Sequence, residues 1–346
     1  INVIDCRPPR AEAVAFADVA ARLRQDAPLG GLFGVRPVPD EYIERERAYA
    51  EALAALRADA IRTTVISAPA KTASSPQSAV AVFGMGGVGK STLAAALAHD
   101  CQVRRHFHHG VIWLEVGQTP SAPALQAVVG AHFGDDPTTY TEESGAVRLS
   151  GVLHDKQALI VLDDVWDDRI VSRFPVHTTA CRLLITTRNG ALAGRVQGAD
   201  IRLGMLTPEE GARLIARRTG MGSENDPTCR AISERLGGHT LAVALAAAQI
   251  ANRYANSPAE MLRLIDRRAA GDEPFADLAI DETDKDKNLS MSLGLSYDAL
   301  PSDTLRRRFR ALGVLAREGT FDRAVLAAVW GDADADDARA PLARLR

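Results

Sequence analysis

Five short apolar runs, each rich in β-branched residues, constrain the fold of this chain more than any other feature of its sequence. Segments with helical or loop patterns separate the runs. Strands that are apolar along their whole length are buried on both faces, and strands that alternate with helices form a parallel sheet covered by helices. The sequence therefore predicts an α/β domain whose strands lie at 79–83, 111–116, 159–163, 183–187 and 201–206.

A glycine-rich segment directly follows the first of these strands. Residues 84–92 read GMGGVGKST, fit the phosphate-loop pattern GxxxxGK[ST] and lead into a helical run. Backbone N–H groups of such a loop surround a β-phosphate, at a helix N-terminus that favours anions. Lys90 is expected to bridge the β- and γ-phosphates, and the Ser91 hydroxyl to bind Mg²⁺. The predicted nucleotide-binding residues of this segment are Gly84, Gly86, Gly87, Val88, Gly89, Lys90, Ser91 and Thr92.

The strand predicted at 159–163 ends in a pair of carboxylates. Asp163 closes the strand and Asp164 follows it, which is the Walker B pattern. We expect Asp163 to hold Mg²⁺ through water and Asp164 to orient or deprotonate an attacking water. Asp163, Asp164 and Lys90 are therefore the candidate catalytic residues, and Ser91 and Asp163 the candidate metal ligands. The alternative is that one of the two carboxylates caps a helix.

An arginine follows the strand predicted at 183–187. Some phosphate-loop domains insert a strand between the two Walker strands, which gives the sheet order 2-3-4-1-5. In that order the carboxyl end of the inserted strand points at the γ-phosphate, because ligands lie at the carboxyl ends of parallel strands. Arg188 is predicted to sense the γ-phosphate through charge-assisted hydrogen bonds. The alternative is an ordinary surface arginine.

Length and composition indicate a folded chain with several domains. Its 346 residues exceed the usual domain length of roughly 100 to 150 residues. With 46% hydrophobic and 25% charged residues, the composition is typical of globular proteins. The net charge of −3 gives no general attraction to nucleic acid or membranes, and the apolar helical run 241–248 is shorter than the roughly 20 residues that cross a bilayer. We therefore expect neither a membrane nor a nucleic-acid partner.

Four scattered cysteines form no CxxC pair, which favours a reducing compartment and a cytoplasmic location. The chain starts at Ile1 without a leader pattern, so we expect it to be a fragment. After the sheet the pattern is helical, with helix starts at 207–210, 226–227 and 257–260 that combine N-cap residues with an early proline.

The combined motifs resemble the NB-ARC class of STAND NTPases, which includes the apoptotic protease-activating factor and plant disease-resistance proteins. The resemblance rests on the phosphate loop, on the runs 163–166 and 185–188, on the helix start at Thr207 and on Gly238-His239-Thr240-Leu241-Ala242, and it spans about 37–331. It implies a P-loop domain with a parallel sheet, then a small helical domain and a winged-helix domain. We divide the chain into a tail of an upstream region or linker (1–36), the P-loop domain (37–220), the helical domain (221–270), a linker (271–288) and a winged-helix domain (289–346) that we expect to be truncated.

The resemblance also implies an adenine site. In the family, an aliphatic residue and an arginine flank the adenine, and Ile43 and Arg45 match those positions. The alternative for this pair is an ordinary helix start. The chain departs from the family at Thr240, where members have a proline near the nucleotide. It also lacks, before Arg346, the histidine by which members contact the β-phosphate of ADP.

The function that the resemblance implies is an ADP/ATP-operated signalling switch in bacterial defence, innate immunity, cell death or regulation. Such a switch is closed with ADP, and it oligomerises with ATP to activate an attached effector. ADP or ATP and Mg²⁺ are the implied cofactors, and the implied partners are further copies of the chain, an upstream effector and a downstream sensor. ATPase activity would be slow at most. Two alternatives are a P-loop kinase or hydrolase with real turnover and a DNA-binding transcriptional regulator.

Overall fold

The computed structural model describes residues 28–58, 79–84, 86–176, 180–189, 198–252, 255–269, 300, 302–312 and 323–332. Most of the expected upstream tail and the whole expected linker at 271–288 lie outside the described residues. So does Met85 of the phosphate loop.

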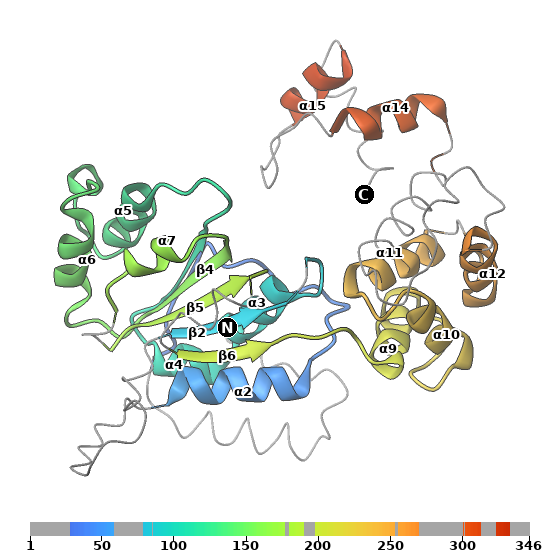
Figure 1. The fold of residues 1–346 in the computed structure, drawn as a ribbon, viewed down its shortest axis with the longest axis horizontal. Coiled ribbons are helices and arrows are strands. Elements are labelled where there is room, and N and C mark those ends of the chain that lie inside the picture. The colour runs from blue at the N-terminus through green and yellow to red at the C-terminus, as the bar shows by residue number, and fades with distance from the viewer. Residues whose placement is uncertain are drawn as a thin grey trace.

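A parallel sheet of six strands forms the centre of the fold (Figure 1). The five predicted strands lie in the order 2-3-4-1-5, as β3-β4-β5-β2-β6. The difference from the prediction is a sixth strand, β1, which pairs with β3 at the sheet edge and is too short to leave a sequence pattern. The strands are β1 (Leu32–Phe33), β2 (Ala79–Phe83), β3 (Val111–Glu115), β4 (Leu159–Val165), β5 (Arg182–Thr187) and β6 (Gly198–Arg202).

The last strand lies earlier in the sequence than predicted. β6 begins at Gly198, whereas the apolar pattern predicts a strand at 201–206. Leu203 and Leu206 are buried, but they belong to the segment that leads from the sheet to the next helices. Ile201 still pairs with Val82, and the N–H of Leu203 donates to the carbonyl oxygen of Phe83, whereas Leu206 packs in the core of the bundle. The apolar run therefore combines the end of the strand with residues buried against the neighbouring helices.

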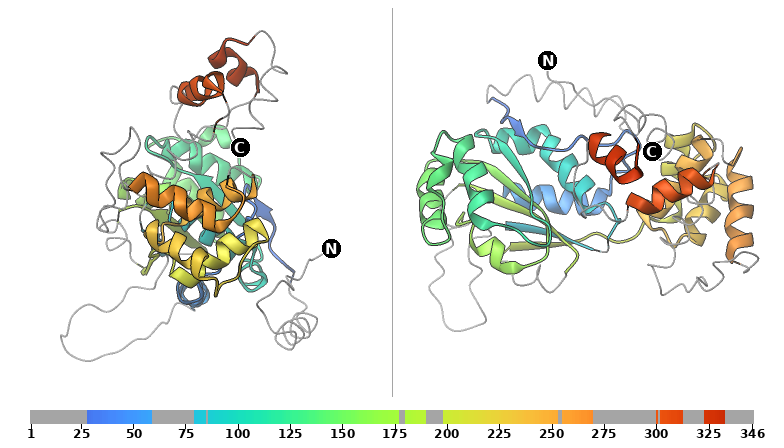
Figure 2. Two further views of the ribbon diagram at one scale, coloured as in Figure 1. Left: turned by 90° about the vertical axis from the view of Figure 1, so that its right-hand side faces the viewer. Right: turned by 90° about the horizontal axis from the view of Figure 1, so that it is seen from above.

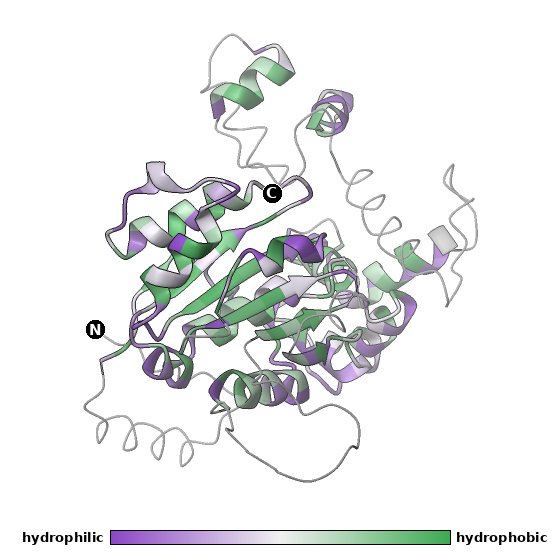
Figure 3. Ribbon diagram, turned by 60° about the vertical axis from the view of Figure 1, so that its left-hand side comes forward, coloured by the Kyte–Doolittle hydropathy of each residue, from purple (hydrophilic) through white to green (hydrophobic). Residues whose placement is uncertain are grey.

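Helices cover both faces of the sheet, and alternate residues of each strand point to opposite faces. Val80 and Val82 of β2 face one side, and Ala79 and Ala81 face the other. Figure 3 shows hydrophobic strands between helices whose hydrophilic sides face outward. The first face is covered by α2 (Glu46–Arg57), α3 (Lys90–His99) and α4 (Cys101–His106), and the second by α5 (Ala122–His132), α6 (Gly145–Leu153) and α7 (Asp168–Ser172).

Four helices form a bundle at the end of the sheet to which the strand arrows point (Figures 1 and 2). Thr207 and Glu210 form the predicted capping box, Asp226 caps the next helix, and Ser257 accepts from the N–H of Glu260 at the predicted third start. The first helix packs into the bundle core through Ala212, Leu214 and Ile215. The helices are α9 (Pro208–Thr219), α10 (Pro227–Arg235), α11 (Thr240–Ala251) and α12 (Pro258–Ala269).

Two more helices follow, α14 (Asp303–Ala311) and α15 (Arg323–Trp330), and they pack against each other through Leu312, Leu326 and Trp330. Arg308 of α14 pairs with Asp332 and lies 5.2 Å above the ring of Trp330. This arginine is therefore engaged inside the helix pair. Within the described part of the chain, no helix combines the length and apolar character needed to cross a bilayer.

Candidate functional site

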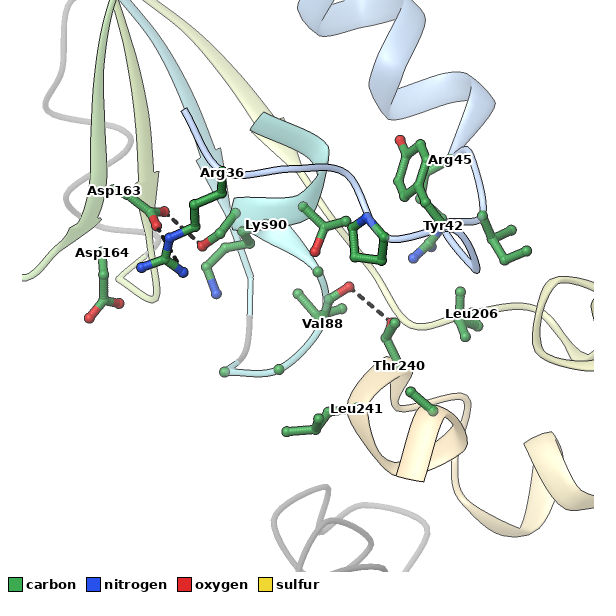
Figure 4. A pocket seen from close by; sticks show the side chains of 18 of the residues that line it. Arg36, Tyr42, Arg45, Val88, Lys90, Asp163, Asp164, Leu206, Thr240 and Leu241 are labelled. Carbon is green, nitrogen blue, oxygen red and sulfur yellow. Dashed lines mark hydrogen bonds and ion pairs between the residues drawn. The ribbon is translucent and has the colours of Figure 1, made fainter. Parts of the chain in front are cut away.

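A cavity of about 480 Å³ lies where the carboxyl ends of the strands meet the helical bundle. Ligand sites of small molecules have volumes of roughly 300 to 1,000 Å³. Figure 4 shows Arg36, Asp163 and Lys90 on the sheet side of this cavity, and Thr240 and Leu241 on the bundle side. Both domains therefore contribute to one site.

The phosphate loop connects β2 to α3 along one wall of the cavity. Gly87 and Gly89 have φ angles of 72° and 101°, which residues with a Cβ rarely adopt. At Gly87 a Cβ would also lie 2.7 Å from Cε1 of His239. The glycine is therefore required by the backbone conformation and by the close approach of the bundle.

Lys90 is the first residue of α3, and only 7% of it is exposed. Its ammonium donates to the carbonyl oxygen of Gly84 at 3.0 Å. The pKa of Lys90 is lowered to about 8, first because burial removes water from the ammonium and second because Arg188 is nearby, although Asp164 and Asp163 oppose the shift. A ligand that brings negative charge to this lysine would stabilise its protonated form.

The two predicted metal ligands lie side by side. The Ser91 hydroxyl donates to Oδ1 of Asp163 at 2.7 Å, and the hydroxyl of Thr186 donates to the same oxygen at 2.5 Å. The side chain of Asp163 is 4% exposed. Hydroxyl and carboxylate oxygens suit Mg²⁺, which takes only one or two protein ligands beside phosphate oxygens and water. Ser91 and Asp163 fit that requirement, and the described residues contain no larger cluster of metal-binding side chains.

Asp164 occupies an irregular position at the end of β4. The pairing of β4 with β5 shifts register between Leu162 and Val165, and Asp164 has a φ of 56°. Its carboxylate accepts from Nε1 of Trp166 at 2.7 Å and lies 3.5 Å from Nε of Arg188. The structure thus brings the predicted water-orienting carboxylate and the predicted γ-phosphate sensor together.

The alternative role for the two carboxylates, helix capping, does not apply to α7. The N-cap of that helix is Asp167, whose side chain accepts from the N–H of Arg169. Asp163 and Asp164 both line the cavity instead.

The two predicted adenine residues line the cavity in different ways. Ile43 is buried and belongs to the hydrophobic core of the bundle, although it precedes α2 in the sequence. The guanidinium of Arg45 donates to the carbonyl oxygens of Gly204 and Met205, at 3.1 and 2.6 Å, and so holds the segment between β6 and α9. Helix α2 begins directly after Arg45, so the pair is also a helix start.

Arg36 is a site residue that sequence reasoning missed. Its Nη2 lies 2.6 Å from Oε1 of Glu115, and its Nη1 lies 4.0 Å from Oδ2 of Asp163. It reaches the site because β1 pairs with β3, which brings the following segment beside the carboxyl ends of β3 and β4. A two-residue strand carries no periodicity, so the sequence held no signal for this placement.

Parts of the chain are similar to known proteins. Residues 65–225 match the family model described as the NB-ARC domain. Apoptotic protease-activating factor 1 from Danio rerio is 35% identical over 131 residues, which are 34% of this chain and 10% of that protein. Disease resistance protein RGA2 from Solanum bulbocastanum is 26% identical over 269 residues, which are 73% of this chain and 26% of that protein.

A bacterial relative has a regulatory name. Regulatory protein AfsR from Streptomyces griseus is 30% identical over 209 residues, which are 56% of this chain and 21% of that protein. The chain spans about a quarter or less of the length of these relatives. Among solved structures, a STAND protein with a tetratricopeptide repeat sensor from Pyrococcus horikoshii matches 90% of this chain and 51% of its own, with 13% identity and a TM-score of 0.47.

Proposed function

Since residues 65–225 match the family model of the NB-ARC domain, we propose that this chain is the core of an ADP/ATP-operated signalling switch. The switch is closed with ADP, and with ATP it opens, oligomerises and activates an effector attached upstream, under the control of a downstream sensor. Its setting is the cytoplasm. The names of the relatives, an apoptotic protease-activating factor, a disease-resistance protein and a regulatory protein, support a role in cell death, defence or regulation.

The observation that carries the proposal is that one cavity is shared by two domains. The phosphate loop forms one wall, and the apolar residues Leu206, Leu214 and Ala244 of the bundle side form another. A nucleotide with its phosphates at Lys90 would place its base towards Ile43 and the bundle. A bound nucleotide would therefore contact both domains, and its chemical state would affect how they are held together.

The phosphate-binding roles follow from the arrangement of charges. Loop N–H groups would bind the β-phosphate, and Lys90 would serve both the β- and γ-phosphates. Ser91, and Asp163 through water, would hold Mg²⁺, which supplies positive charge to the phosphates when it is bound. When ATP is present, the Arg188 side chain would leave Asp164 and bind the γ-phosphate instead. Asp164 then has the position to orient a water for slow hydrolysis.

The energies indicate that ATP alone does not operate the switch. Shifting a two-state equilibrium from 1:99 to 99:1 takes about 5.5 kcal/mol of differential binding. A hydrogen bond to a charged group contributes roughly 1.5 to 3 kcal/mol. The Arg188 contact alone is therefore too weak, and a sensor signal has to supply the remainder.

In this proposal residues 289–346 form a winged-helix domain, and this domain completes the closed form. The mutual packing of α14 and α15 supports a folded unit there. Arg308 contacts Asp332 and Trp330 inside that unit, which favours a structural role for this arginine over DNA contact.

The test identifies the nucleotide that copurifies, by chromatography of the denatured protein, and then measures light scattering in ADP and in ATP with Mg²⁺. We expect a predominantly monomeric, ADP-bound protein with slow turnover and only partial assembly in ATP, because the test supplies no sensor signal. Lys90→Ala serves as the control, because it removes the charge that serves both phosphates. A stable oligomer in ADP, or a monomer turning over at tens per second as metabolic kinases do, would reject the switch in favour of an ordinary enzyme.

A further inference from the structure

We propose that His239 and Thr240, at the start of α11, position the phosphate loop and so make nucleotide affinity depend on the placement of the helical bundle. The inference rests on the proposed function to the extent that the loop binds nucleotide.

Three consecutive residues of the bundle bond to three consecutive carbonyl oxygens of the loop. One bond comes from an imidazole, one from a hydroxyl and one from a backbone N–H. They join Nε2 of His239 to the oxygen of Gly86 at 2.9 Å, Oγ1 of Thr240 to that of Val88 at 2.9 Å, and the N–H of Leu241 to that of Gly87 at 3.0 Å. Figure 4 shows the bond between Thr240 and Val88 crossing from one domain to the other.

These bonds orient the loop N–H groups that the phosphates require. In a trans peptide unit the carbonyl and the N–H of the next residue point in opposite directions. Because the oxygens of residues 86–88 turn towards α11, the N–H groups of residues 87–89 turn away from it. Residues 87–89 also line the cavity. The start of α11 therefore selects a loop conformation in which these donors are available to a phosphate.

The hydrogen bonds of His239 indicate the tautomer of its neutral ring. The residue is 1% exposed, and its Nδ1 accepts from the N–H of Ala242 as the N-cap of α11. A ring nitrogen that accepts carries no proton, so the proton of the neutral ring is on Nε2, which donates to Gly86. The same side chain thus caps the bundle helix and supports the loop.

The start of α11 is also tied to the segment between the domains. The N–H of Leu206 donates to the oxygen of Gly238 at 2.8 Å, and a Cβ at Gly238 would lie 2.2 Å from the oxygen of Leu206. Arg45 holds the preceding carbonyl oxygens, at Gly204 and Met205. Movement of the bundle about this segment would withdraw the support of the loop, and by linkage bound ADP would favour the closed bundle.

Two pairs of variants separate positioning from simple stability. His239→Asn keeps a good N-cap acceptor but is too short to reach Gly86, whereas His239→Gln keeps a donor near the position of Nε2. Thr240→Val removes only the hydroxyl donor, and Thr240→Ser keeps it. We expect His239→Asn and Thr240→Val each to weaken the binding of ADP and ATP alike by roughly three- to tenfold, and the two conservative variants to stay within about twofold.

The measurements use ADP and ATP that carry a fluorescent methylanthraniloyl group, with thermal unfolding of the nucleotide-free protein as the folding control. Hydrogen exchange of the Leu241 amide supplies a second readout, because ADP should protect it in the parent and less in Thr240→Val. If His239→Asn fails to fold, Thr240→Val still tests the inference, because valine has almost the shape of threonine and lacks only the hydroxyl donor. If His239→Asn and Thr240→Val bound nucleotide as tightly as the parent, the inference would be overturned but the proposed function would stand. If the parent bound no nucleotide, the proposed function itself would be overturned.

Discussion

The guanidinium of Arg188 lies 3.5 Å from the carboxylate of Asp164, and its Cζ lies 5.0 Å from the centre of the Trp166 ring. The Arg188 side chain is 48% exposed, so its ion pair with Asp164 contributes little to stability. The ion pair instead keeps the two residues in contact, and each of them has a role in the proposed reaction. A γ-phosphate that attracts Arg188 would release Asp164 at the same time.

The first prediction concerns this exchange. Arg188→Ala should lower ATP affinity by about tenfold or more and leave ADP affinity within about twofold, because the guanidinium meets a phosphate only when the γ-phosphate is present. Calorimetric titration with each nucleotide measures both values. Arg47→Ala, at an exposed arginine on α2, is the matched control. An equal loss for both nucleotides would point to structural damage and contradict the sensor role.

The sheet was predictable because burial of its strands on both faces leaves an unmistakable pattern. β2 lies where the apolar run predicts it, and β4 runs only two residues further, to Val165. β1 and β6 were harder to predict for a physical reason. β1 has only two residues, and β6 begins with Gly198 and Ala199. The apolar residues after β6 are buried without being part of the strand, Leu203 in the core against the sheet and Leu206 in the core of the bundle.

The functional site likewise contains residues that could be predicted from the sequence and residues that could not. Ser91 and Asp163 could be paired from the sequence because each belongs to a motif whose strand and helix context fixes where the side chain goes. Arg36 and His239 could not, because each reaches the site through contacts between segments far apart in the chain. Sequence reasoning placed Thr240 in a run that resembles the family and noted that members have a proline there, and the hydroxyl bond to Val88 gives that threonine a role of its own.

A second prediction follows from the pKa of Lys90, which is about 8 in the nucleotide-free protein and 10.5 ordinarily. Between these two pH values the unfolded chain binds more protons, so this lysine makes the free energy of unfolding rise with pH there. Nucleotide binding should have the opposite dependence, because phosphates require the protonated ammonium. Above pH 8 the affinity should fall by up to tenfold for each pH unit, with uptake of a proton.

Calorimetry in buffers of different ionisation enthalpy counts that proton. Lys90→Arg is the control, since arginine stays charged at every pH of the experiment. The nucleotide affinity of this variant, whatever its value, should therefore not change between about pH 7 and 9.5. An affinity of the parent that is constant over the same range would contradict the link between burial of Lys90 and binding.

A third prediction concerns the metal. Ser91→Ala removes the hydroxyl that lies 2.7 Å from Asp163, which leaves the carboxylate as the one protein group of the proposed Mg²⁺ pair. The factor by which Mg²⁺ enhances ATP affinity should then be severalfold smaller than in the parent. The ATP affinity measured in the presence of a chelator, without Mg²⁺, should change little. Titrations of fluorescent ATP with and without Mg²⁺ measure the difference, and Ser172→Ala, a hydroxyl on α7, is the control. An unchanged Mg²⁺ effect would remove Ser91 from the metal site.

The last prediction concerns Arg36, whose Nη1 lies 4.0 Å from Oδ2 of Asp163. In a water-like dielectric a unit positive charge opposes the arrival of a divalent ion by about 2 kcal/mol at 4 Å and by about 1 kcal/mol at twice that distance, and Arg36 is half exposed. Arg36→Gln should therefore lower the Mg²⁺ concentration needed for half-maximal ATP binding by about fivefold. The effect should shrink at high ionic strength because salt screens exposed charges.

Glu115 provides the complementary variant, because it draws the guanidinium of Arg36 away from Asp163 through a contact of 2.6 Å. Glu115→Gln should raise the Mg²⁺ requirement, and the double variant should behave like Arg36→Gln, since the glutamate acts through the arginine. ATP affinity at saturating Mg²⁺ distinguishes competition from direct binding. If Arg36→Gln lost affinity there, Arg36 would be a phosphate ligand, and its charge would serve the nucleotide and not oppose the metal.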